Sequence, residues 1–238
     1  MRIDFHSHIL PAADHGSDGI TTTLAQLRMM HEAGTDAVVA TPHFYPSKMT
    51  LASFLARRDE CAARLAAAKG EDTPQIFLGA EVLVCPGLQE MAGLERLAIA
   101  GTKLILLEMP FRAWDRKIIE TVTDIRDIGL CPILAHIDRY DKNEVQRLLR
   151  RGICAQVNAD AVAGAFAYLK NRHYFKGNAV VALGSDLHGA ERGGYKHFTR
   201  AVARLGDTAE AIFARSEALL EGALPLEKAV AQPQAAKV

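Results

Sequence analysis

The chain has 238 residues, with 28 lysines and arginines balanced by 28 aspartates and glutamates, so its formal net charge is zero. This balance argues against a general electrostatic surface for nucleic acid or for an anionic membrane. The length suits one domain, since β/α barrels run to about 200–250 residues as a single unit. No apolar run approaches the ~20 residues that a membrane span needs.

Apolar runs that read as strands alternate along the chain with segments of helical spacing. The strands are expected at residues 2–6, 36–41, 75–80, 103–108, 131–136, 153–158 and 179–184. Helical spacing lies between them, for example over 21–33 and 51–69, and continues to about residue 222. This alternation favours an α/β fold with a parallel sheet. We expect one barrel domain over residues 1–222 and a loosely packed tail over 223–238.

The first strand ends in His6-Ser-His8, which is the strongest local signal in the chain. Residues two apart on a strand point the same way, so both imidazoles reach one side. Taken alone, the pair could be two unrelated surface histidines. Asp186-Leu-His188 repeats the geometry after the last strand, which favours a shared metal site.

Other strand ends also deliver polar groups, namely His43, Glu81, Glu108 and His136. Each one alone could be a helix cap, a salt-bridge partner or a satisfied rim histidine. A carboxylate after an apolar stretch is costly to desolvate unless a cation compensates it, and parallel barrels place such groups at their carboxyl-end rim. Nitrogen and oxygen donors without sulfur suit Mn, Fe or Zn. The number of donors implies two or three ions, with Glu81 as a bridge between two of them.

A cytoplasmic location is expected because the first strand starts at residue 2 and carries His6 and His8, which the cleavage of a leader would remove. The four cysteines have no Cys-x-x-Cys spacing and are expected to be reduced thiols.

Several of these segments together resemble the polymerase-and-histidinol-phosphatase (PHP) superfamily. They are most similar to its bacterial manganese-dependent protein-tyrosine phosphatases of capsule and exopolysaccharide synthesis. The matching stretches are His6-Ser-His8-Ile-Leu-Pro, Ala-Thr-Pro-His43, Ala-His136-Ile-Asp-Arg-Tyr-Asp, Gln-Val-Asn158 and Ser-Asp186-Leu-His188. The resemblance implies a distorted (β/α)7 TIM-like barrel of the PHP type with a three-metal centre, most commonly of Mn2+, with Fe or Zn as alternatives.

The same resemblance implies a distribution of ligands. One ion would take His6, His8, Glu81 and Asp186; a second would take Glu81, Glu108 and His136; a third would take His43 and His188 with an aspartate from the first loop. The family reads Asp-Asp-Gly in that loop, whereas this chain reads Asp14-His15-Gly16. His15 therefore replaces the expected aspartate, and the choice between Asp14 and His15 stays open.

Two arginines are candidates for phosphate binding, because a guanidinium offers a planar fork of donors to phosphate oxygens. Arg139 lies in the matching stretch after His136, and Arg192 follows His188 with a shift of one residue. Either could instead form a surface salt bridge. In the implied mechanism a metal-bound hydroxide attacks phosphorus in line, while the metals and arginines take up the charge.

The expected function is a metal-dependent phosphomonoester hydrolase, specifically a protein-tyrosine phosphatase. The resemblance implies a phosphotyrosine protein as its partner, a bacterial tyrosine autokinase that regulates polysaccharide synthesis. An oligomer is possible on the sequence. The alternatives are a PHP phosphatase of small molecules such as histidinol phosphate, or a metal-binding scaffold without activity.

Overall fold

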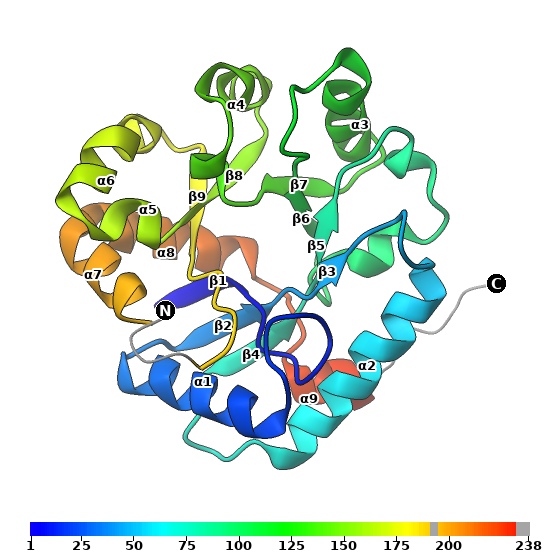
Figure 1. Ribbon diagram of the computed structural model, residues 1–238, viewed down its shortest axis with the longest axis vertical. Helices are drawn as coiled ribbons and strands as arrows, with labels where there is room; N and C mark the ends of the chain where they lie inside the picture. Colours follow the sequence, from blue (N-terminus) through cyan, green and yellow to red (C-terminus); the bar gives the residue numbers. More distant parts are fainter. Residues whose placement is uncertain (191–194, 232–238) are drawn as a thin grey trace.

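The computed structural model describes residues 1–190 and 195–231, in which parallel strands form a barrel that helices surround (Figure 1). All paired strands are parallel. The strands are β1 (Ile3–Ser7), β2 (Ala37–Ala40), β3 (His43–Phe44), β4 (Gln75–Leu78), β5 (Glu81–Leu83), β6 (Leu104–Glu108), β7 (Cys131–Leu134), β8 (Cys154–Asn158) and β9 (Val180–Gly184).

These segments make seven passes of the chain, as the sequence predicts, because two of the passes continue beyond the expected strands 36–41 and 75–80 as a second short strand. Thr41 and Pro42 separate β2 from β3, and Gly79 and Ala80 separate β4 from β5. A proline lacks the N–H that would continue the ladder, which accounts for the first interruption. The ladder consequently divides into two sheets, with the orders β1-β2-β4 and β3-β5-β6-β7-β8-β9.

The ring closes where β1 meets β9. A parallel bridge joins Ser7 to Leu187, and the amide of Asp186 donates to the carbonyl of His6 over 2.8 Å. This closure brings the first and last strands side by side, so that the two ends of the expected metal site meet.

Helices cover the outside of the barrel (Figure 1). None of the described helices is both long and apolar enough to cross a membrane. The longer ones are α1 (Ile20–Glu32), α2 (Leu51–Ala68), α3 (Arg116–Asp127), α4 (Lys142–Leu149), α7 (Lys196–Leu205) and α8 (Asp207–Leu219), and the shorter ones are α5 (Asp160–Ala163), α6 (Ala165–Asn171) and α9 (Leu226–Ala231).

Alternation along the strands divides the buried residues into two clusters. Val39 belongs with Phe5 and Leu106 in the smaller cluster, which fills the barrel, whereas its neighbour Val38 packs with Leu27 of α1 in the larger cluster. The reason is the period of two along a strand, which sends successive side chains to opposite faces. The smaller cluster thus consists of apolar side chains contributed by several strands of the barrel.

The expectation of a loosely packed tail is wrong for part of that segment. Leu226 opens α9 and is fully buried, and Pro225 forms an antiparallel bridge with Phe77 of β4. Lys69 at the end of α2 pairs with Glu227 over 2.6 Å. The helix therefore covers one flank of the barrel, and residues 232–238 lie outside the described part.

Candidate metal centre

Imidazoles and carboxylates from distant strands meet at the carboxyl ends of the barrel. The register between β1 and β2 shifts between Asp4 and Ser7, which is the signature of a bulge. His6 and His8 are both fully buried. The other predicted members of the cluster that lie around them are His43, Glu81, Glu108, His136, Asp186 and His188.

Glu81 lies at the centre of the cluster. Its Oε2 is 2.9 Å from His43 Nδ1, 3.2 Å from His6 Nε2 and 3.4 Å from His8 Nε2. Its Oε1 accepts a hydrogen bond from His136 Nε2 over 2.8 Å. A single carboxylate thus contacts four imidazoles, two from the end of β1, one from β3 and one from the loop after β7.

Asp186 joins the same group from the far end of the barrel. Its Oδ1 lies 3.2 Å from His8 Nε2 and 3.6 Å from His6 Nε2, while those two nitrogens face each other at 3.2 Å. Two facing imidazole lone pairs repel each other unless a proton or a cation lies between them. An ion with bonds of about 2.0–2.2 Å separates its ligand atoms by about this spacing.

Buried polar atoms without a hydrogen-bond partner indicate where a metal ion would fit. Among the described residues, five buried side-chain atoms of the cluster have no hydrogen-bond partner: His43 Nδ1, Glu81 Oε2, Glu108 Oε2, His136 Nδ1 and His188 Nε2. His43 Nδ1 and Glu81 Oε2 are close but lack hydrogen-bond angles. Such orphans are costly in a native structure unless an ion or water satisfies them.

Three groups of donor atoms lie close enough together for each to hold an ion. They are His6, His8 and Glu81; His43, Glu81 and Glu108; and His8, His43 and His188. The donors are nitrogen and oxygen only, which suits first-row divalent metals and not a thiolate-type zinc site. The residues present therefore fit a polynuclear metal centre.

Asp14 and His15 have different places in the first loop. Both oxygens of Asp14 are engaged: Oδ2 accepts from His8 Nδ1 over 2.7 Å and from the amide of His43 over 3.0 Å, and Oδ1 accepts from the amide of Gly16. The His15 ring stacks 4.8 Å from His43 and 4.7 Å from His188. Asp14 thus orients His8 and turns its Nε2 toward the cluster, as outer-shell carboxylates do for metal-binding histidines.

Sequence reasoning missed Gln156, which is fully buried on β8. Its Oε1 accepts from the amide of His136 over 2.6 Å and lies 3.2 Å from His6 Nδ1, while its Nε2 donates to Asn158 Oδ1. Asn158 in turn donates to Asp186 Oδ2 over 3.2 Å. The two amides occur two residues apart on a predicted strand, so their shared direction was a usable signal.

The backbone itself re-aims two members of the cluster. His136 has φ 31° and Asp186 has φ 53°, and these are two of the three positive φ values found among the described residues other than glycine. The left-handed region costs such residues about 1–3 kcal/mol and persists where the surroundings demand it. Gly184 lies beside this turn, where an added Cβ would come within 2.6 Å of His6 Cβ.

Arg139 reaches the cluster from the loop after β7. Its Nη2 donates to Asp186 Oδ2 over 2.5 Å, and its side chain is partly exposed. It lines a cavity of about 390 Å³ together with Asn158, Asp186 and His188. The other candidate, Arg192, lies outside the described residues.

Charges within the cluster compensate one another. Burial would raise the pKa of Glu81, but His6, His136 and His43 hold it well below its usual range. Burial would lower the pKa of His8, yet Asp14, Asp186 and Glu81 raise it well above its ordinary value. Both directions show that the imidazoles and carboxylates of the cluster stabilise one another's charged forms when no cation lies among them.

The chain resembles proteins of one family along most of its length. The family model for capsular polysaccharide synthesis, CpsB/CapC, matches residues 2–204. The chain belongs to this family. The tyrosine-protein phosphatase YwqE of Bacillus subtilis is 28% identical over 198 residues, which cover 78% of this chain and 77% of that protein. The tyrosine-protein phosphatase CpsB of Streptococcus pneumoniae is 26% identical over 206 residues, covering 78% and 82%.

A solved structure supports the fold of this CpsB/CapC family member. Crystal structures exist for YwqE from Bacillus subtilis and for CpsB from Streptococcus pneumoniae, two proteins that are described as unique metal-dependent tyrosine phosphatases. The matching chain superposes with a TM-score of 0.77 at 22% identity and covers 93% of this chain and 95% of its own length. The expected barrel of the PHP-type phosphatases is thereby confirmed.

Proposed function

We propose that this CpsB/CapC protein is a metal-dependent tyrosine phosphatase that hydrolyses phosphotyrosine in a protein substrate. The observation that carries the proposal is the convergence of four imidazoles on Glu81, beside an arginine that is fixed by Asp186. The relatives YwqE and CpsB are tyrosine phosphatases, which supports the same activity for this protein.

The ligand sets we propose are those that the family resemblance implies, and His6, His8 and Glu81 of the first set also lie close enough together to hold an ion. His6, His8, Glu81 and Asp186 would hold one ion; Glu81, Glu108 and His136 a second; and His43 and His188 a third. Bound ions would activate water as a nucleophile and neutralise the charge of the phosphoryl group. We propose His15 for the third position, because its ring adjoins His43 and His188 while both oxygens of Asp14 are engaged elsewhere.

The chain's own residues would bind and orient the substrate. Arg139 keeps guanidinium N–H groups beyond the one that Asp186 accepts, and it faces the cavity next to His188. It would bind the phosphate oxygens and stabilise charge that grows on them. The leaving tyrosinate, with an ordinary pKa of about 10, needs less proton assistance than an alkoxide. Arg192 stays a second candidate for the phosphate.

Manganese is the metal that we propose, because the donors are imidazole and carboxylate and the related enzymes are metal-dependent. Iron and zinc accept the same donors. Elemental analysis of protein purified without added metal and then reconstituted with each ion distinguishes them by stoichiometry and by rate.

The experiment that tests the activity compares three substrates under Mn2+ and again with chelator. A phosphotyrosine peptide should be hydrolysed faster than a phosphoserine peptide of the same sequence and faster than histidinol phosphate. Chelator should abolish all three rates. Preference for histidinol phosphate would replace the proposal with a small-molecule phosphatase, and equal background with and without metal would replace it with a scaffold.

The finer proposal concerns the partner. We propose that the phosphoprotein substrate is a bacterial tyrosine autokinase. The family is one of capsular polysaccharide synthesis, and the resemblance implies a tyrosine autokinase as the phosphorylated partner. Incubation of the phosphorylated kinase with this protein, followed by phosphotyrosine immunoblotting, would measure the loss of signal directly.

A further inference from the structure

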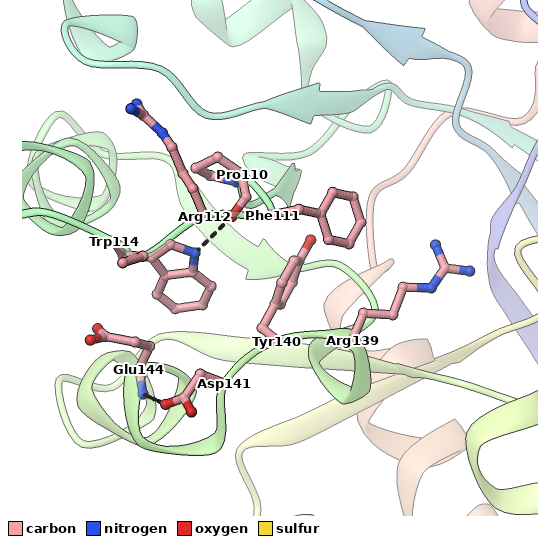
Figure 2. Close-up of a pocket in the computed structure, with 9 residues that line it drawn as sticks. Pro110, Phe111, Arg112, Trp114, Arg139, Tyr140, Asp141 and Glu144 are labelled. Atoms are coloured by element: carbon pink, nitrogen blue, oxygen red, sulfur yellow. Dashed lines mark hydrogen bonds between the residues drawn. The ribbon is translucent and has the colours of Figure 1, made fainter.

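A second cavity adjoins the metal centre on the other side of Arg139. It has a volume of about 430 Å³ and is lined by residues of the loop between β6 and α3 and by residues after β7. Figure 2 shows Phe111 and Tyr140 next to Arg139, with Trp114 on the other side of Tyr140. Arg139 lines this cavity as well as the one beside His188, so the two spaces share one guanidinium.

Phe111 is the unusual member of this surface because its side chain is 70% exposed. Its ring is almost parallel to that of His136, with 6.4 Å between centroids and 11° between planes, and it lies 5.7 Å from the Tyr140 ring. The exposed aromatic face thus begins directly beside an imidazole that contacts Glu81. Exposed aromatic rings in a cleft mark binding sites for apolar or aromatic groups.

The loop that carries Phe111 is braced and does not depend on Phe111 itself. The amide of Met109 donates to the Tyr140 hydroxyl over 3.0 Å, and Trp114 Nε1 donates to the carbonyl of Pro110 over 3.0 Å. The Trp114 ring meets Tyr140 edge-on at 5.3 Å. Tyr140 and Trp114 hold the loop, while Phe111 projects from it into solvent, which is a preorganised arrangement for a ligand.

We propose that Phe111 and Tyr140 form the surface that receives the phenyl ring of phosphotyrosine, and so select it over phosphoserine. This inference rests on the proposed phosphatase function. If Arg139 and the adjacent cluster hold the phosphate, its ester oxygen would point toward the second cavity, because Arg139 lines both cavities. A ring stacked on Phe111 at the usual separation of about 4.5–7 Å remains next to His136. A seryl phosphate has no ring to place there.

The test measures binding to the Mn-loaded protein by calorimetry, with phenylphosphonate and methylphosphonate as probes that are not hydrolysed. The unsubstituted protein should bind phenylphosphonate about tenfold more tightly than methylphosphonate, the size expected for one stacked ring. Phe111→Ala should remove most of that preference, and Phe111→Tyr should restore it. With a phosphotyrosine peptide, Phe111→Ala should raise KM by a similar factor with little change in kcat.

Phe166→Ala is the matched control, since Phe166 on α6 is 88% exposed and lines neither cavity. It should leave both affinities and the peptide kinetics unchanged. Equal losses for both phosphonates in Phe111→Ala, or no loss for either, would overturn the ring surface. A protein that keeps the phenyl preference yet fails to hydrolyse phosphotyrosine would instead refute the proposed function and leave the ring surface standing.

Discussion

Glu81→Gln is the substitution that tests the metal centre most directly. It keeps the size of the side chain but removes the negative charge that four imidazoles share at 2.8–3.4 Å. Loss of an outer-shell partner costs about 10–100-fold in metal affinity. Loss of the central carboxylate should therefore cost at least about 100-fold, which corresponds to about 2.7 kcal/mol.

The consequence can be read in thermal stability as well as in metal content. Saturating metal stabilises a protein through its affinity, so a 100-fold loss removes up to about 2.7 kcal/mol of that stabilisation. For a chain of this size, 1 kcal/mol shifts Tm by about 2–4 °C, so the metal-induced rise in Tm should shrink by about 5–10 °C. The metal-free Tm should change less, because Gln can still accept the hydrogen bond from His136.

The assay pairs elemental analysis after dialysis with calorimetric unfolding in the presence and absence of Mn2+. Glu120→Gln is the matched control, because Glu120 lies on the exposed surface of α3 and pairs only with Arg116 among the described residues. The control should retain metal, turnover and the full rise in Tm. Unchanged metal content and turnover in Glu81→Gln would refute the reasoning that this carboxylate holds the ions together.

Three further predictions follow from the same geometry. Asp14→Asn should lower metal affinity about 10–100-fold, because His8 Nδ1 loses its carboxylate partner; a titration with Mn2+ measures it, and wild-type affinity would show that Asp14 does not orient His8. Glu108→Gln should weaken metal retention and turnover with little loss of fold, which metal analysis and circular dichroism report together; an unchanged rate would make Glu108 a simple strand-end cap. Leu226→Ala should lower the free energy of unfolding by about 2–5 kcal/mol, because the side chain is fully buried; denaturant unfolding measures it, and a change near zero would mean that α9 does not stabilise the barrel.

The loop residue that replaces an expected aspartate illustrates how a substitution can redistribute roles. The family resemblance implies a carboxylate at the position of His15, where this chain has a ring stacked against His43 and His188. Asp14 binds His8 and the amide of His43, so it stabilises the loop and one ligand at once. The third proposed ion, next to His43 and His188, would then have the neutral imidazole of His15 as a ligand in place of a negatively charged carboxylate. We therefore expect this ion to bind more weakly.

Local sequence patterns predicted the strands, most of the helices and the imidazoles and carboxylates that gather at the rim of the barrel. The spacing of apolar residues in a strand or a helix is a local property, so it can be recognised in the sequence without knowing how the rest of the chain folds. His6 and His8 could be paired for the same reason, since residues two apart on a strand share a direction. The helix α9 escaped prediction because a helix of six residues is too short to be stable by itself and depends on the burial of Leu226 on the barrel.

Only the tertiary structure decided how those donors are aimed and what stands beside them. His136 and Asp186 have left-handed backbone, and their amides are held by contacts with remote parts of the chain, namely Gln156 Oε1 and the carbonyl of His6. Gln156 acquires its role by lying next to His6 and His136, which are far from it in sequence. No local pattern distinguishes Phe111, which the fold places beside His136. Sequence thus determined which chemical groups were present, whereas the closure of the ring determined their distances, because contacts between remote strands have no local signature.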